Sequence, residues 1–198
     1  PVLGVMRAAD LDEAIELQNA PAYGLTAGLH SLDADEVVHW ANRVEAGNLY
    51  VNRGITGAIV RRQPFGGWKR SSVGGSTKAG GPSYVGCFGT WMPVAREPKQ
   101  NLSLRRLGDA ARALLEAAQP GMDFIGFDAA RAGARDDERA WQDEFGLARD
   151  VSDLGVERNL LRYRPAPEVW VRLAEGAPIA GLVRVLAAAA RAAAPVVV

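Results

Sequence analysis

A chain of 198 residues with 48 % hydrophobic content is long enough for one large domain or two small ones with a substantial core. Its formal net charge is zero, which argues against a dedicated nucleic-acid binder, and its single cysteine excludes an intrachain disulfide and is typical of a reducing, cytoplasmic compartment. No run resembles a signal peptide or a membrane span, because Arg184 and Arg191 interrupt the Ala-rich stretch near the C-terminus.

The first 52 residues alternate between short apolar runs and amphipathic stretches. Apolar runs at 2–7, 25–29 and 49–52 predict strands. Asp10 is expected to cap a helix that ends near residue 19, and Asp33 a second helix. This order of strands and helices predicts an α/β fold with a parallel sheet covered by helices.

Residues 46–95 form the most unusual stretch of the chain. They hold eleven of its 22 glycines and no Asp or Glu. Glycine lets the backbone take positive φ and approach a ligand closely, so that its amides can serve as donors. We therefore expect a loop that binds a carboxylate or a phosphate, and its basic residues are Arg53, Arg61, Arg62, Lys69, Arg70 and Lys78.

The remaining elements follow a different pattern. A run at 84–91 with aromatic residues predicts a strand. An amphipathic helix is expected at 104–118 and a charged, Ala-rich helix at 127–145. Alternation from Val169 to Leu173 predicts another strand. After it we expect a helix from Pro178 to about residue 194 and the beginning of a strand in the final valines. Together these elements are half of a βαβ unit.

Both ends of the chain are expected to be cut. Pro1 opens directly on an apolar run, and Val196 to Val198 indicate a strand that has just begun. We therefore expect a piece of a longer polypeptide, whose active site is incomplete here.

Several spaced motifs between Pro1 and Trp91 resemble the C-terminal part of the aldehyde dehydrogenase superfamily. Within it they are most similar to the branch that oxidises L-glutamate γ-semialdehyde, which comprises Δ1-pyrroline-5-carboxylate dehydrogenase and bifunctional proline utilisation A. The motifs are Gly-Asn-Leu-Tyr-Val-Asn-Arg-Gly at 47–54, Thr-Gly-Ala-Ile-Val at 56–60, Gln-Pro-Phe-Gly-Gly at 63–67 and Lys-Ala-Gly-Gly-Pro-Ser-Tyr at 78–84.

The resemblance implies a division of the chain into three parts. Residues 1–95 would be the C-terminal part of the catalytic domain, with an oligomerisation strand at 84–91 that pairs with a partner subunit. Residues 96–150 would form a helical linker region. Residues 151–198 would begin an additional, partial Rossmann-like βαβ domain, although Glu175-Gly176-Ala177-Pro178 is not the glycine-rich phosphate turn that binds a cofactor.

The resemblance also implies roles for single residues in substrate binding. The backbone amides of Gly57 and Ala58 would hold the α-carboxylate of the substrate, and Phe65 would pack beside its aliphatic chain. The alternatives are an ordinary surface turn and a core phenylalanine. Four basic residues of the loop are interpreted as solvated surface charge rather than ligands: Arg61, Arg62, Lys69 and Arg70.

No catalytic residue is expected in this chain. The family's nucleophilic cysteine, its general-base glutamate and the fold that binds NAD would all precede Pro1, so the chain alone is expected to be inactive. Cys87 has apolar neighbours and is interpreted as a small core residue. His30 and His39 lack the spacing of a metal site and are expected to be structural or exposed.

Three functions stay open on the sequence alone. The preferred one is a fragment of an NAD-dependent L-glutamate γ-semialdehyde dehydrogenase of proline catabolism, which takes up the aldehyde on a thiol and passes a hydride to NAD. The second is a non-catalytic interaction module that forms a homo-oligomer through residues 84–91. The third is an aldehyde dehydrogenase of another specificity.

Overall fold

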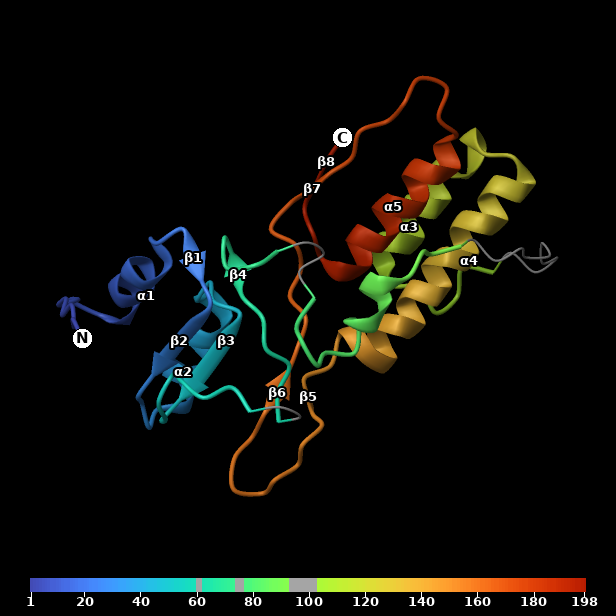
Figure 1. Ribbon diagram of the computed structural model, residues 1–198. Helices are drawn as coiled ribbons and strands as arrows, with labels where there is room; N and C mark the ends of the chain where they lie inside the picture. The colour runs from blue at the N-terminus through green and yellow to red at the C-terminus, as the bar shows by residue number, and fades with distance from the viewer. Residues whose placement is uncertain (60–61, 74–76, 93–102) are drawn as a thin grey trace. The chain divides into compact units, whose positions relative to one another are not determined.

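The computed structural model describes residues 1–59, 62–73, 77–92 and 103–198 (Figure 1). The chain is mixed α/β and divides into two compact units. Unit 1 comprises Pro1–Met92 and Asp150–Leu160, and unit 2 comprises Pro93–Arg149 and Leu161–Val198.

The two helices of unit 1 begin where the sequence predicts. A carboxylate oxygen of Asp10 accepts a hydrogen bond from the Glu13 amide at 2.9 Å at the start of α1 (Leu11–Asn19). Asp33 does the same for α2 (Ala34–Arg43), accepting from the Asp35 amide at 2.8 Å. Both caps satisfy amides that have no partner within the helix, and both predictions are confirmed.

A pair of parallel strands is the centre of unit 1. β2 (Thr26–Leu29) pairs with β3 (Asn48–Val51) over their full length, as predicted for a sheet covered by helices. A second, antiparallel pair joins β1 (Tyr23–Gly24) to β4 (Trp68–Lys69). The core of the unit is apolar and consists of Ile15 from α1, Ala27 from β2, Trp40 from α2, Val44 and Ala46.

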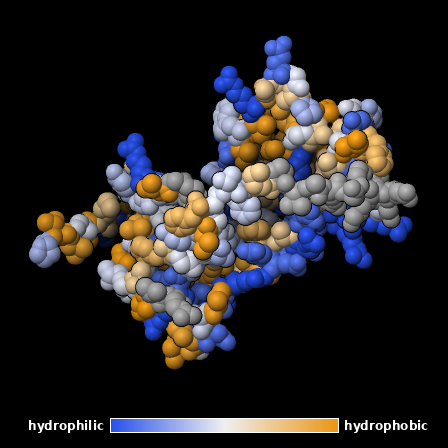
Figure 2. Space-filling model, turned by 45° about the vertical axis from the view of Figure 1, so that its right-hand side comes forward, coloured by the Kyte–Doolittle hydropathy of each residue, from blue (hydrophilic) through white to orange (hydrophobic). Residues whose placement is uncertain are grey.

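Two predicted strands are absent from unit 1, and both predictions were wrong. Residues 2–7 take no regular structure and leave Val2 and Leu3 exposed, so that the N-terminal segment carries apolar side chains on the surface (Figure 2). Residues 84–91 contain a 3₁₀ helix, Val85–Phe88, instead of a strand. A strand needs a neighbour for its backbone hydrogen bonds, and neither segment pairs with another strand of the described residues.

Three helices make up most of unit 2. They are α3 (Asp109–Ala118), α4 (Phe124–Ala140), which continues into a π-helical turn (Trp141–Phe145), and α5 (Ile179–Ala192). A 3₁₀ turn, Gln119–Gly121, links the first two. α4 begins three residues earlier than predicted because the Asp123 carboxylate accepts from the Gly126 amide at 2.7 Å.

The helices of unit 2 share one core, in which Leu115, Phe127 and Val183 are buried. A buried ion pair on α4 joins Arg131 to Asp128 at 2.6 Å. Among the helices of the described residues, none combines the length and apolar character needed to cross a membrane.

Short strands complete the chain. β5 (Arg149–Asp150) and β6 (Leu160–Leu161) flank the segment that returns to unit 1. In unit 2, β7 (Val169–Trp170) pairs in parallel with β8 (Val196–Val197), and α5 connects them. The predicted order of strand, helix and strand is therefore present, although β7 is shorter than expected.

Candidate functional site

The glycine-rich loop after β3 presents two successive backbone amides, those of Gly57 and Ala58. Gly57 has φ +85°, a left-handed conformation that favours glycine. Gly57 and Ala58 are both exposed, and neither amide bonds to another residue of the described part of the chain. Two successive amides without partners can bind an anion, which is the chemistry expected of this loop.

Phe65 lies on the segment that leaves the loop. It is half-buried and forms an isolated antiparallel bridge with Ala79, with its amide and carbonyl bonding at 3.0 and 2.9 Å. Gly57 and Ala58 are adjacent residues of one exposed loop. Two cavities form among the described residues of unit 2, of ≈ 480 and ≈ 360 Å³, and none of these three residues lines either one.

Buried polar contacts fasten the Pro-Phe-Gly-Gly segment to β3. Asn48 donates from Nδ2 to the carbonyls of Leu25 at 2.8 Å and Gly66 at 3.0 Å. Lys78 Nζ donates to the carbonyl of Gly66 at 2.8 Å and to that of Gly47, and burial lowers the pKa of this ammonium group.

Gly47 has to be a glycine because the backbone of Gly66 leaves no room for a side chain there. A Cβ on Gly47 would lie 1.9 Å from the Gly66 carbonyl oxygen. The motif residues around β3 therefore hold the end of the loop in place.

Two of the four basic residues expected to be solvated surface charge form ion pairs instead: Lys69 with Glu45 and Arg62, which is partly exposed, with Glu157. Lys69 pairs with Glu45 at 2.6 Å and donates to the carbonyls of Asn19 and Pro21, and only 20 % of its side chain is exposed. The reason is that β4 pairs with β1 and so brings Lys69 against the end of α1. Arg70 is exposed, as predicted, whereas Arg61 lies outside the described residues.

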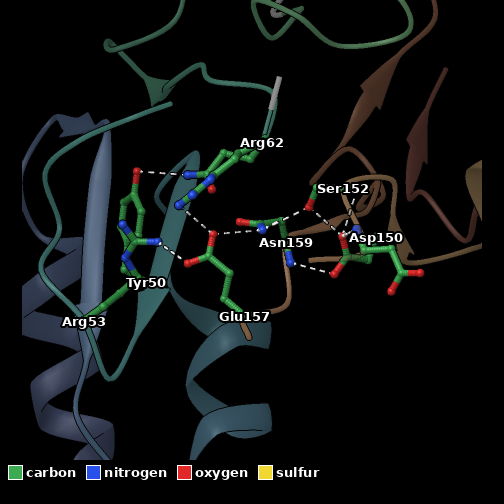
Figure 3. A network of polar contacts seen from close by, with 9 residues as sticks. Tyr50, Arg53, Arg62, Asp150, Ser152, Glu157 and Asn159 are labelled. Carbon is green, nitrogen blue, oxygen red and sulfur yellow. Dashed lines mark hydrogen bonds and ion pairs between the residues drawn. The ribbon is translucent and has the colours of Figure 1, made fainter. Parts of the chain in front are cut away.

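The acid that the loop sequence lacks comes from a distant part of the chain. Glu157 pairs through one carboxylate oxygen with Arg53 at 3.1 Å and through the other with Arg62 at 3.1 Å (Figure 3). The guanidinium of Arg53 also lies over the ring of Tyr50, 5.5 Å from its centre. Sequence reasoning missed Glu157, because an acid-free window shows that a counter-charge is needed and does not show which acid supplies it.

Residues 150–160, which we call the strap, are themselves ordered around Asp150. Its carboxylate accepts from the amides of Asn159 at 2.9 Å, Asp153 at 3.0 Å and Ser152 at 3.1 Å, and the Ser152 hydroxyl adds a bond at 2.9 Å. These bonds, that from Asn159 above all, lower the pKa of Asp150. Asn159 also donates from Nδ2 to Glu157 at 3.2 Å (Figure 3).

Cys87 and His39 each contact a neighbouring polar side chain. Cys87 is exposed and lies 3.0 Å from the Thr77 hydroxyl, so its interpretation as a core residue was wrong. The cause is the 3₁₀ turn, which replaces the expected strand and buries none of its residues. His39 contacts the Asp12 carboxylate at 2.6 Å, and no group of three potential metal ligands occurs within the described ranges.

The turn between β7 and α5 does not fit a dinucleotide. It lacks the spaced glycines that let a backbone approach a pyrophosphate, and Glu175 adds an exposed negative charge to the turn. Pro178 offers no side-chain cap and no amide at the helix start. NAD is therefore not assigned to this segment.

Comparison with known proteins agrees with the motifs and the parallel strands of unit 1. Residues 1–89 match the model of the aldehyde dehydrogenase family, and this part of the chain belongs to that family. Members of the family use NAD(P).

Three of the similar proteins are named PutA or 1-pyrroline-5-carboxylate dehydrogenase. The chain is 43 % identical to the bifunctional protein PutA of Rhizobium meliloti over 60 % of its length, and 42 % identical to the 1-pyrroline-5-carboxylate dehydrogenase of Staphylococcus aureus over 43 %. The structure of proline utilization A from Corynebacterium freiburgense covers the whole chain with a TM-score of 0.82 at 45 % identity. The chain spans only 10 %, 16 % and 19 % of these three proteins, respectively.

Proposed function

We propose that this chain is part of an NAD-dependent dehydrogenase that oxidises L-glutamate γ-semialdehyde to L-glutamate. In this proposal the amides of Gly57 and Ala58 hold the carboxylate of the substrate, and Phe65 packs beside its aliphatic chain. NAD, the nucleophilic thiol and the general base belong to other parts of the enzyme. Residues 1–95 would complete the catalytic domain, 96–150 would link it, and 151–198 would begin a further domain.

One observation carries the proposal. An 85-residue stretch of the chain is 42 % identical to a protein named 1-pyrroline-5-carboxylate dehydrogenase, and the loop lies within the family match at residues 1–89. The geometry supports it, since Gly57 takes a left-handed conformation and its amide and that of Ala58 are free among the described residues. An amino-aldehyde with a carboxylate is a suitable ligand for two adjacent donors.

The test is a substitution of Ala58, whose amide is the second of the pair. It is made in the complete enzyme to which, in this proposal, the chain belongs. Ala58→Phe places a bulky group where the carboxylate would bind, so we expect KM for L-glutamate γ-semialdehyde to rise at least about tenfold. KM for propanal, which has no carboxylate, should stay within about twofold. The matched control is Ala177→Phe, at an exposed turn of unit 2.

The same experiment separates the proposal from another aldehyde specificity. If Ala58→Phe changes the two aldehydes equally, or changes neither, no carboxylate binds at this loop. The preferred aldehyde would then have to be found by comparing substrates without a carboxylate.

A second candidate function is assembly through residues 84–91. Aromatic and aliphatic side chains there are exposed, with Val85 and Phe88 at 77 % and Trp91 at 86 %. Such a group of apolar side chains suits a contact with a second copy of the protein. Light scattering on a Phe88→Ser/Trp91→Ser variant tests this candidate, and an unchanged mass would refute it.

A further inference from the structure

The two ends of the proposed anchoring loop are joined by a residue from the strap. Arg53 precedes the loop and Arg62 follows it, and each contacts a different oxygen of Glu157 at 3.1 Å (Figure 3). About a quarter of the Glu157 side chain is exposed, 26 %, against 36 % and 40 % for the two arginines. All three residues belong to unit 1, so the contact lies within one compact body.

We propose that Glu157 is a positioning residue for substrate binding, which acts by clasping both ends of the loop that carries Gly57 and Ala58. The inference rests on the proposed function. Glu157 itself would not touch the substrate. It would act through Arg53 and Arg62.

Loop entropy gives the first physical reason. A glycine-rich loop whose ends are free samples many conformations, and only a fraction of them direct both amides at one point. Apparent affinity falls in proportion to the fraction of molecules in the binding-competent state. A carboxylate that bridges the two ends raises this fraction without contacting the ligand.

Charge gives the second reason. With Glu157 in place, Arg53 and Arg62 each have a carboxylate partner, so neither guanidinium competes with the amides for the substrate's carboxylate. Without Glu157, two unpaired guanidinium groups would bind the same carboxylate away from the tip of the loop. Both effects weaken productive binding when Glu157 is lost.

The strap is built to hold Glu157 in place. Asp150 accepts bonds from three amides of the strap, and Asn159 extends this network to a carboxylate oxygen of Glu157 at 3.2 Å. A side chain presented by an ordered segment loses less conformational entropy on forming its ion pairs. This is the arrangement expected of a positioning residue rather than of a chance surface pair.

The test of activity uses Glu157→Gln in the complete enzyme. We expect KM for L-glutamate γ-semialdehyde to rise about fivefold to tenfold, with kcat, KM for NAD and KM for propanal within about twofold of the parent. In an Arg53→Met/Arg62→Met background, adding Glu157→Gln should change KM no further, because residues that act as a unit are not additive. An unchanged or lower KM, or a full further increase in that background, would overturn the inference. Glu175→Gln is the matched control at an exposed turn.

A second readout does not depend on activity. Trypsin cleaves after arginine, and loss of the Glu157 ion pairs should expose the ends of the loop to it. We therefore expect cleavage between residues 53 and 62 of the 198-residue chain to be about fivefold faster in Glu157→Gln than in Glu175→Gln. Equal cleavage rates would refute the clasp. An enzyme that does not oxidise the semialdehyde but shows the faster cleavage would instead refute the proposed function and keep the clasp.

Discussion

Asn48 provides the sharpest test of how the loop is held in place. Its side chain is 6 % exposed and donates from Nδ2 to the carbonyls of Leu25 and Gly66 at 2.8 and 3.0 Å. A third contact, from the Gly66 amide to Oδ1, is 3.4 Å long and contributes little. Two hydrogen bonds of about 0.5–1.5 kcal/mol each predict that Asn48→Ala lowers the local free energy of unfolding by about 1–3 kcal/mol.

Native-state hydrogen exchange measures this loss where it should occur. The amides to follow in unit 1 are that of Asn48, which donates to the carbonyl of Leu25 at 3.0 Å, and that of Asn52, which donates to the carbonyl of Leu29 in β2 at 2.9 Å. Amides of α4 in unit 2 are the internal control and should not change. Asn48→Asp keeps the volume but turns an oxygen toward two carbonyls, so its loss should be at least as large. A loss below about 0.5 kcal/mol, or an equal loss in α4, would mean that the Asn48 side chain does not hold this part of unit 1 together.

Two further predictions concern charge and catalysis. Burial lowers the pKa of Lys78 below its ordinary value of 10.5, so between the lowered pKa and 10.5 the unfolded chain binds a proton that the folded chain lacks. The free energy of unfolding should therefore rise with pH through this window, and Lys78→Met should remove the rise. Urea titrations at several pH values measure both. The isolated chain should form no NADH from L-glutamate γ-semialdehyde, because the proposal places the thiol and the NAD site elsewhere, and robust turnover would contradict it.

Local signals in the sequence identified the helices well. Asp10 and Asp33 are followed by amphipathic runs, and a cap acts over only three residues, so the starts of α1 and α2 could be predicted without knowledge of the fold. Asp123 is the same signal in unit 2, and the periodicity of α4 alone did not reveal it.

Strands were predicted less well because they depend on partners. The runs at 25–29 and 49–52 are neighbours in the structure and form β2 and β3. The runs at 2–7 and 84–91 are equally apolar, but neither pairs within the described residues, and neither forms a strand. Apolar alternation shows that a segment can form a strand, whereas pairing decides whether it does.

For the candidate site, too, local sequence signals and tertiary contacts carry different information. Motif and composition pointed to Gly57 and Ala58, and the positive φ of Gly57 agrees with a role that needs glycine. Cys87 was misplaced, because its exposure depends on a turn that its neighbours do not specify. Lys69 was misplaced because its partners lie on α1 and before β3.

Residues close together in the chain were enough to indicate the family resemblance between Pro1 and Trp91, the starts of α1 and α2, and a glycine-rich loop without acids. Folding alone brought Glu157 to Arg53 and Arg62, which are 104 and 95 positions away from it in the chain. Charges attract through space and not along the chain, so composition shows that a cation needs a partner, and the fold alone decides which carboxylate it meets.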